Sequence, residues 1–299
     1  MTELHLYPVK SLGGLPLQRA SVEPWGLAGD RRWALVDETG DVVTARRVHE
    51  LLRLTAEVVD DETIRITDRA DGGSILVDTP LGLGPVPIDL SRLPFAAPAD
   101  EDVNGWLTDR VGTRVRLVWQ EDPTARTISG AHGGMPGDHV SMADTGPLLL
   151  ASEASMAQLN GWIAEDSDAP DVPDLDPDDL SDTSPERPAE PLLINRFRPN
   201  VVIDGEAPFA EDGWPAVWIG DVHFRTTEPC DRCVMTTIDP LTLAGGKEPI
   251  RTLARHRRWD GRTWFGIRLV PFTPGEIRVG DAVVPGDAAG PGDTAGVVR

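Results

Sequence analysis

The feature that most constrains the fold of this chain is a run of short, strand-length segments in its first third. These segments are apolar or alternate apolar with polar residues, and they read ELHLYPVK, RRWALVDETGDVVTARR, RLTAEVV, TIRITD and SILVD. Turn-forming stretches such as ETG and ADGG separate them, and the residues around DETGD predict a hairpin. Strands at this spacing predict a barrel or sandwich rather than a parallel α/β sheet.

The rest of the chain predicts further strands and a few helices. Strand patterns continue in RVRLVW, NRFRPNVVID, PAVWIGDVHFRTT, TWFGIRLVPF and GEIRVGDAVVP. Helical patterns occupy DEDVNGWLTDRVG, SEASMAQLNGWIAE and EPIRTLARHRR. In the second of these, Ser152 is a candidate N-cap, and Met156, Leu159 and Ile163 share one face. The predicted fold is therefore mainly β (α+β) with a few helices.

Length and composition predict two domains. The chain has 299 residues, of which 40% are hydrophobic, and this is enough for two domains with real cores. Near residue 120 the strand pattern gives way to a loop rich in Gly and Pro, so we place one domain at 1–118 and a second at 119–286. Residues 165–190 contain eleven Asp or Glu, one Arg and five Pro, which predicts a disordered acidic insertion. Residues 287–299 predict a flexible tail.

The charge and the N-terminal segment exclude several classes of protein. A net charge of −21 argues against non-specific binding to nucleic acid. The N-terminal stretch MTELHLYPVKSLGG has no apolar core of a signal peptide, and no segment approaches the length of an apolar membrane span. We therefore expect a cytoplasmic, monomeric protein with reduced thiols and no membrane partner.

The only two cysteines, Cys230 and Cys233, form a single C-x-x-C in TEPCDRCVMTTIDP. A structural zinc site is disfavoured because no second C-x-x-C and no H-x-x-x-H accompany the pair. A thioredoxin-like dithiol is weakened by the β-branched VMTTIDP that follows, which favours a strand or turn over a helix. Two further readings remain, namely small buried hydrophobic residues or a thiolate ligand for a metal held mainly by an organic cofactor.

Several dispersed stretches carry residues suited to binding such an anionic cofactor. YPVKSLGG places Lys10 and Ser11 at a strand end, and Lys10 is one of only two lysines beside twenty-six arginines. GLAGDRRW places Arg31 and Arg32 before a strand, where one of them can face a ligand and the other solvent. Each stretch alone is equally compatible with an ordinary strand end or surface pair.

Two further stretches add polar groups of the same kind. Strand alternation in NRFRPNVVID places Arg196, Arg198 and Asn200 on one face. ADTGP presents Asp144 and Thr145 ahead of an expected helix, where backbone N–H groups are free.

Two more stretches have both a functional and a structural interpretation. The helix in EPIRTLARHRR carries Arg251, Arg255 and Arg258 on one face, either as a solvated surface or as a docking surface for an acidic electron-transfer protein. The loop AHGGMPGDHV is either an ordinary surface loop or the lining of a substrate entrance.

Taken together, these motifs resemble the MOSC-domain family, and more narrowly the mitochondrial amidoxime-reducing component and its bacterial relatives. The motifs YPVKSLGG, GLAGDRRWALVDETG, RFRPNVVIDG, FAEDGW, PCDRCVMTTIDP, EPIRTLARHRR, FGIRLVP and GEIRVGD occur in the order expected of that family. The resemblance implies an N-terminal MOSC β-barrel domain at 1–118, followed by a MOSC domain at 119–286.

The resemblance also implies a cofactor and the residues that hold it. The cofactor is molybdenum–molybdopterin, bound between the two domains, with Cys233 as the ligand of the metal. Residues matching cofactor contacts in the family are Lys10, Ser11, Arg31, Thr145, Arg198 and Asn200, and Asp144 lies near the metal as a possible proton relay. Cys230 matches a family cysteine that is not a ligand, and Gly146 in ADTGP limits any contact there to the backbone.

The activity implied by the resemblance is reduction of N-hydroxylated small molecules such as amidoximes and hydroxylamines. Two cysteines cannot hold an iron–sulfur cluster, so the electrons are expected from a separate ferredoxin- or cytochrome-type protein. The alternative is a carrier that binds molybdenum cofactor, or holds persulfide sulfur on Cys233 or Cys230, without turnover of its own. A metal-free dithiol reductase is a third hypothesis.

Overall fold

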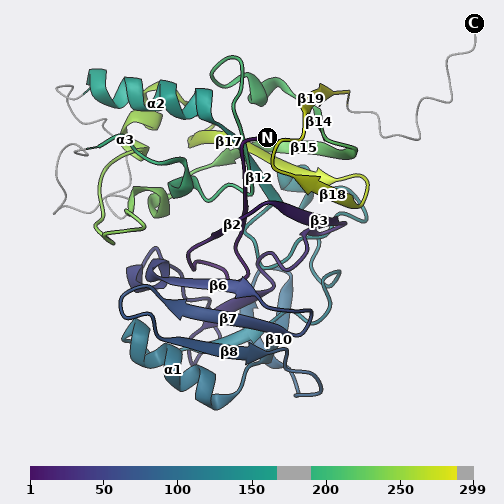
Figure 1. Cartoon of the computed structure of the whole chain (residues 1–299), viewed down its shortest axis with the longest axis vertical. Helices are drawn as coiled ribbons and strands as arrows, with labels where there is room; N and C mark the ends of the chain where they lie inside the picture. Colours follow the sequence, from purple (N-terminus) through teal and green to yellow (C-terminus); the bar gives the residue numbers. More distant parts are fainter. Residues whose placement is uncertain (167–189, 288–299) are drawn as a thin grey trace, which may run out of the picture.

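The chain forms two lobes in the computed structural model, which describes residues 1–166 and 190–287 (Figure 1). The largest sheet lies in the upper lobe of Figure 1 and has nine strands. Its strands are, in spatial order, β19 (Val283–Gly286), β14 (Ala216–Ile219), β15 (Val222–Asp231), β17 (Arg262–Pro271), β12 (Leu148–Ser152), β13 (Val201–Ile203), β1 (Glu3–Leu6) and β2 (Leu15–Leu17), with β16 (Arg258–Trp259) beside β17.

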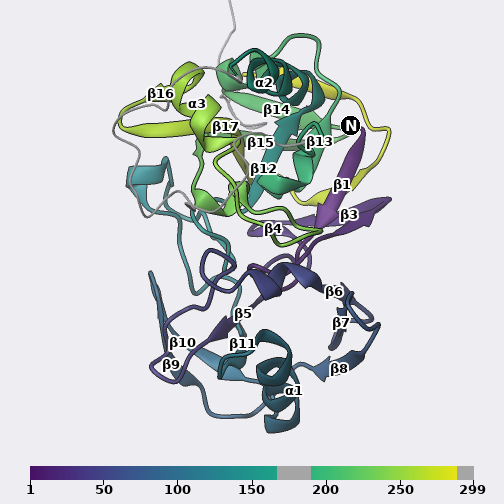
Figure 2. The ribbon, with the colours of Figure 1, turned by 90° about the vertical axis from the view of Figure 1, so that its left-hand side faces the viewer.

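Three smaller sheets complete the β-structure. The first is β5 (Trp33–Val36), β11 (Arg116–Trp119), β10 (Leu93–Pro98) and β9 (Val86–Leu90), and the second is β6 (Leu54–Val58), β7 (Thr63–Asp68) and β8 (Ser74–Asp78). The third is β18 (Gly275–Arg278), β3 (Arg19–Glu23) and β4 (Gly26–Leu27). The first two lie on opposite sides of the lower lobe (Figure 2).

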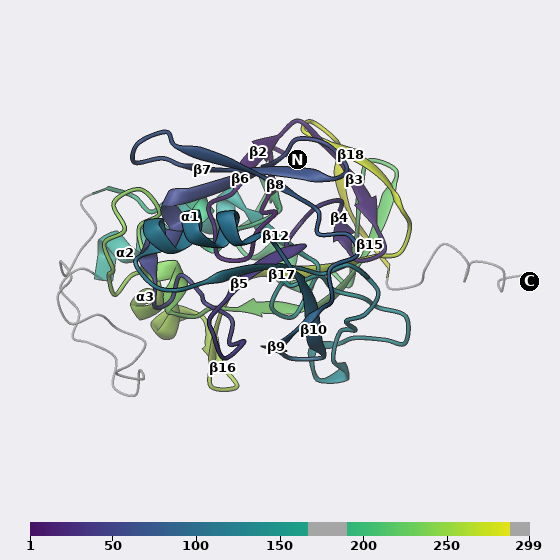
Figure 3. The ribbon, with the colours of Figure 1, turned by 90° about the horizontal axis from the view of Figure 1, so that it is seen from below.

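Three α-helices occur within the described residues, together with five short 3-10 helices. The α-helices are α1 (Glu101–Val111), α2 (Glu153–Glu165) and α3 (Ile250–His256). The 3-10 helices are η1 (His49–Arg53), η2 (Gly130–His132), η5 (Ile194–Phe197), η6 (Ala210–Gly213) and η7 (Val234–Thr237). Seen from below, α1 covers the open end of the lower lobe between its two sheets (Figure 3). The prediction of a mainly β fold with a few helices is confirmed.

The N-terminal strands belong in space to the sheet of the second half of the chain. β1 pairs with β13 through Glu3 and Val202, and β3 pairs with β18 through Arg19 and Arg278. Strands β1 and β3 are thereby joined to the upper lobe, whereas Val9 and Leu12 between them lie in the core of the lower lobe. The division that we placed at residue 118 stays a prediction.

Each lobe has its own apolar core, and the core of the lower lobe includes residues from distant parts of the chain. Leu4, Leu150 and Phe224 are fully buried in the core of the upper lobe. The core of the lower lobe contains Leu35 and Ile66, and also Ile238 from the second half of the chain. Because Ile238 follows Cys233 by five residues, its burial holds the segment with the two cysteines against the lower lobe.

Helix predictions succeeded where a capping residue and an apolar face coincided. The side chain of Ser152 accepts a hydrogen bond from the N–H of Ser155, as expected of an N-cap. Met156, Leu159 and Ile163 are all buried on the inner face of α2.

Two expectations about local structure were wrong. NRFRPN is not a strand, because η5 occupies 194–197 and Arg198 adopts a left-handed backbone, so that β13 begins only at Val201. The three arginines of EPIRTLARHRR do not share a helix face either. Arg251 is buried against Glu248, and Arg258 lies in β16 beyond the end of α3. In the sequence, the alternation and the helical spacing gave no indication that the backbone changes direction at these points.

Two predicted segments lie largely outside the described residues. Of the acidic insertion at 165–190, the structure describes only Glu165, Asp166 and Glu190. Of the tail at 287–299, it describes only Asp287.

His223 supplies a test of the upper-lobe core. Its ring is 1% exposed and stacks on Trp218 at a centroid distance of 4.2 Å, and neither ring nitrogen has a hydrogen-bond partner among the described residues. Burial lowers the pKa of His223, so the folded protein holds this ring neutral while the unfolded chain takes up a proton below about pH 6.5. Neutral His223 therefore makes its whole contribution to the free energy of unfolding above about pH 6.5, and this contribution is lost as the pH falls below that value.

We expect His223→Phe to reduce the loss of unfolding free energy between pH 7.5 and pH 5.0, because the apolar ring keeps the stack without titrating. Urea unfolding of both proteins at the two pH values measures this difference. An equal loss in the variant and the wild type would contradict the assignment.

Candidate functional site

One cavity of about 550 Å³ is lined by residues from both halves of the chain. All eight residues that the sequence nominated line it, and they are Lys10, Ser11, Arg31, Asp144, Thr145, Arg198, Asn200 and Cys233. They come from five separate segments, so the fold brings together positions up to 223 residues apart. The cavity is therefore the candidate site.

The lining of this cavity is strongly cationic. Its basic residues are Lys10, Arg31, Arg46, Arg126, Arg196, Arg198, Arg232, Arg262 and Arg268, against two carboxylates, Asp144 and Asp231. The net charge of the whole chain is −21, so the charge of the cavity lining is opposite in sign to that of the protein as a whole. Such a concentration of positive charge in a recess favours an anionic ligand.

Lys10 and Ser11 lie in the turn that follows β1. The N–H of Lys10 donates to the carbonyl of Trp33 at 2.8 Å, and Ser11 has a left-handed backbone with φ of 69°. The Lys10 side chain is 9% exposed and its ammonium pairs with the carboxylate of Asp144. Burial lowers the pKa of Lys10, and the charge of Asp144 opposes this shift.

Arg31 is held at the cavity wall by a buried polar network. Its guanidinium pairs with Asp30 and donates to the side-chain oxygen of Asn200 at 2.7 Å. Asn200 is fully buried and its amide group also donates to Asp30 and to the carbonyl of His5. The amide of Asn200 is thus occupied by protein groups, so in this structure it positions Arg31 rather than presenting free donors.

Tyr7 separates the two arginines that reach the cavity from this side. The guanidinium carbons of Arg31 and Arg198 lie 4.4 Å and 4.3 Å from the centroid of its ring. The aromatic ring between them offers both cations a favourable face. Burial lowers the pKa of Arg198 to about 10, and no carboxylate forms an ion pair with it in the described part of the chain. Arg198 is therefore a half-buried cation that an anionic ligand would stabilise.

Arg126 holds the loop that carries Asp144. Its side chain is 2% exposed and donates to the carbonyls of Ser91, Ser141, Ala143 and Asp144. Four carbonyl oxygens satisfy its donors without neutralising its charge, and burial lowers its pKa to about 10. Arg126 thus fixes the loop and adds positive potential to the cavity.

The carboxylate of Asp144 reaches into the cavity. Its side chain is 62% exposed and pairs with Lys10 and, at 3.6 Å, with Arg46. The charge of Lys10 in particular holds the pKa of Asp144 well below its usual range. Asp144 is therefore an ionised anchor for these cations at neutral pH.

Thr145 has a hydroxyl with no partner. Its Oγ1 is buried at the cavity wall and lacks any hydrogen-bond partner among the described residues. Buried hydroxyls are ordinarily satisfied, so this atom indicates a ligand contact. The expected helix after ADTGP is wrong, because Leu148 begins β12 instead.

Gly146 lies directly against the Arg268 side chain. A Cβ at this position would lie 3.0 Å from that side chain, so a larger residue would require Arg268 to shift.

The two cysteines occupy different environments. Cys230 lies in β15 and is buried, whereas Cys233 precedes η7, is half-buried and lines the cavity, and both thiols are free. VMTT forms the short helix η7, so the segment is a turn and not a strand. Burial lowers the pKa of Arg46, but the charges of Cys233 and Asp144 outweigh it and raise the pKa overall. Arg46 from the lower lobe thus lies against the Cys233 sulfur.

Comparison with known protein families agrees with this geometry. The MOSC N-terminal beta barrel domain matches residues 1–114, and the MOSC domain matches residues 137–284. The chain belongs to the MOSC family. The MOSC domain contains the cysteine segment and the Asp144 loop, and the barrel domain contributes Lys10, Ser11 and Arg31.

Curated MOSC proteins similar to this one cover nearly its whole length. Mitochondrial amidoxime-reducing component 1 from Homo sapiens is 29% identical over 95% of this chain and 82% of its own. Molybdenum cofactor sulfurase from Danio rerio is 27% identical over 95% of this chain but only 34% of its own length. A solved structure, the YUAD protein from Bacillus subtilis, is 11% identical with a TM-score of 0.36 over 95% of this chain and 94% of its own.

Sequence reasoning did not nominate five of the nine basic residues of this cavity, which are Arg46, Arg126, Arg232, Arg262 and Arg268. Arg46 and Arg126 lie in segments without a recognisable motif, and only the tertiary fold brings them to the site. Arg268 carried a usable signal, because it stands between apolar residues in FGIRLVP and a buried charge needs partners.

Among the described residues, no helix combines the length and apolar character needed to cross a membrane.

Asn200 supplies the test of this site's scaffold. We expect Asn200→Ala to lower the free energy of unfolding by about 3 kcal/mol, because each buried partner left unsatisfied costs about 1–3 kcal/mol. Asn160→Ala is the matched control, since its half-buried amide bonds only the backbone of Leu192. Urea unfolding measures the loss of unfolding free energy in each variant. Equal losses would show that the Asn200 network stabilises the fold no more than the hydrogen bonds of Asn160 do.

Proposed function

We propose that this protein binds molybdenum cofactor in the cationic cavity and reduces N-hydroxylated small molecules there. The observation that carries the proposal is the convergence of the free, half-buried thiol of Cys233 with nine cationic side chains on a single cavity. Molybdenum cofactor is an anionic group that combines a phosphate with a metal able to accept a thiolate. The relatives whose names refer to amidoxime reduction and to molybdenum cofactor support the same assignment.

The residues of the cavity fit the two ends of such a cofactor. Lys10, Ser11 and Arg31 provide an ammonium, a hydroxyl and a guanidinium for the phosphate. Thr145 offers the unpartnered hydroxyl described above, and Arg198 offers a half-buried cation without an ion-pair partner among the described residues. Cys233 would supply the thiolate to the metal, with Arg46 beside it.

When bound, the cofactor supplies a two-electron redox centre for cleavage of the N–O bond. The surrounding residues hold and orient it, and the basic lining neutralises its charge. Asp144, which we expected as a proton relay, is held ionised by Lys10, and this suits an anchor better than a proton donor. The electrons would come from a separate ferredoxin- or cytochrome-type protein.

A second candidate function is that of a carrier of cofactor or sulfur. The observation that favours it is a second free thiol, Cys230, at the same cavity as Cys233. The similarity to molybdenum cofactor sulfurases is in keeping with this candidate. Such a protein would bind the cofactor or hold a persulfide without turnover.

Purification from a host that makes molybdenum cofactor tests the proposal. We expect about one molybdenum and one pterin per chain, and reduction of an amidoxime with reduced methyl viologen as the electron donor. Cys233→Ala should lose most of the reductase activity, because the metal loses its protein ligand, whereas Cys230→Ala should retain activity. Cofactor without N–O reduction would favour the carrier, and a wild-type protein without molybdenum would contradict the proposal.

Thr145 separates cofactor binding from folding. Thr145→Val keeps the side-chain shape and removes a hydroxyl that makes no bond in the protein, so the urea midpoint of the cofactor-free protein should stay within experimental error. The retained molybdenum should fall about tenfold, because a hydrogen bond to a charged group contributes about 1.5 kcal/mol. Undiminished molybdenum in the variant would show that the hydroxyl faces no ligand.

A further inference from the structure

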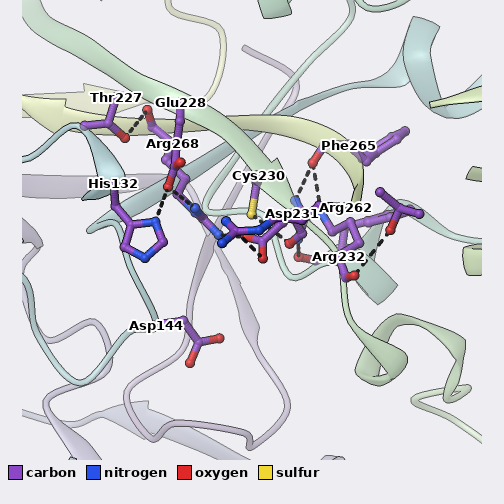
Figure 4. Close-up of polar contacts among 12 residues, drawn as sticks. His132, Asp144, Thr227, Glu228, Cys230, Asp231, Arg232, Arg262, Phe265 and Arg268 are labelled. Atoms are coloured by element: carbon purple, nitrogen blue, oxygen red, sulfur yellow. Dashed lines mark hydrogen bonds and ion pairs between the residues drawn. The ribbon is translucent and has the colours of Figure 1, made fainter. Parts of the chain in front are cut away.

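A second polar group on the cavity wall is formed by His132 and the residues it contacts, none of which is among the proposed phosphate-binding residues. His132 lines the cavity, and its Nδ1 lies 2.8 Å from the Oε1 of Glu228 in β15 (Figure 4). The same Glu228 carboxylate pairs with Arg268, which also pairs with Asp231. His132, Glu228 and Arg268 are 23%, 18% and 7% exposed, so the chain of contacts is largely sheltered from solvent.

The position of His132 is fixed by its backbone. It ends η2, which Ser129 caps at its N-terminus by accepting a hydrogen bond from the N–H of Ala131. The next residue, Gly133, has φ of 70°, and a Cβ there would come within 2.7 Å of the Thr227 carbonyl on β15. Arg225 also donates to the Gly133 carbonyl at 2.9 Å. The loop is therefore pressed onto the strand that carries Glu228.

This arrangement determines which nitrogen of His132 is available. The Glu228 carboxylate pairs with Arg268 and also faces Nδ1 of His132, so Nδ1 is the nitrogen that donates its hydrogen to this carboxylate. Nε2 is left to face a ligand, because no hydrogen bond to it is formed within the described residues. In Figure 4 the second ring nitrogen points away from Glu228, on the side where Asp144 lies. A carboxylate that orients an imidazole in this way is typical of general acid–base catalysis.

We propose that His132, oriented by Glu228, donates the proton that turns the departing oxygen of an N-hydroxylated substrate into water; this rests on the proposed function. For an amidoxime, the balanced reaction consumes two electrons and two protons and yields an amidine and water. The N–O bond breaks, and the departing hydroxyl takes the proton from Nε2 of His132 and leaves as water. The second proton comes from solvent and goes to the nitrogen that becomes the N–H of the amidine. The two electrons come one at a time from a one-electron donor through the cofactor, and water reprotonates His132.

The test uses the cofactor-loaded protein with reduced methyl viologen as the donor and benzamidoxime as the substrate. We expect His132→Ala and His132→Gln to lower kcat about 100-fold with molybdenum content unchanged, since general acids contribute about 10²–10⁴-fold. Added imidazole should restore part of the activity of His132→Ala in proportion to its concentration. It should restore less in His132→Gln, where the larger side chain fills the space. Glu228→Gln should lower kcat more than it raises KM.

His256→Ala is the matched control, because His256 forms a similar pair with Asp166 at 2.8 Å outside the cavity. It should keep kcat within about twofold of the wild type. Three results would overturn the proposal: wild-type kcat in both His132 variants, loss of molybdenum from both, or a loss of kcat that imidazole leaves unchanged. Absence of N–O reduction in the wild-type protein would instead reject the proposed function.

Discussion

The fold must hold nine positively charged side chains around one cavity. Two unit charges 4 Å apart repel by about 4 kcal/mol at the effective dielectric of a protein surface, so such a cluster opposes folding when no anion is present. Six of the nine cations pair with carboxylates, and the other three, Arg126, Arg198 and Arg232, are held by carbonyl oxygens and aromatic faces in the described part of the chain. Arg126 takes four carbonyls, and Arg232 takes those of Phe265 and Phe197. These contacts satisfy donors but leave the positive potential of the cavity in place for a ligand.

The backbone shows how closely the chain is adapted to this cavity. Ser11, Arg31 and Arg198 all have left-handed φ values, between 48° and 69°, although none is glycine. Such conformations are uncommon for side chains of this size and persist where the surrounding structure holds them. All three residues line the cavity, where their side chains point in directions that a regular strand would not allow.

The sequence predicted the composition of the site better than its local geometry. Ordered motifs identified Lys10, Thr145 and Cys233 because each stands beside turn or loop residues whose chemistry is local. The strand expected through Arg198 failed because its reversal depends on contacts with Leu12 and Tyr7, almost two hundred residues away. Arg126 was missed for the same reason, since carbonyls of four distant residues define its role. Fold class followed from strand-length periodicity, which needs no tertiary information.

The central claim is that Cys233 and the cationic lining hold one molybdenum-containing cofactor in this cavity. Anomalous X-ray diffraction at the molybdenum edge, on crystals of protein purified from a cofactor-producing host, tests it most directly. The account predicts one strong anomalous peak inside the cavity, at bonding distance from the Sγ of Cys233. A molybdenum peak anywhere else, or one in the cavity too far from that sulfur for a bond, would contradict it.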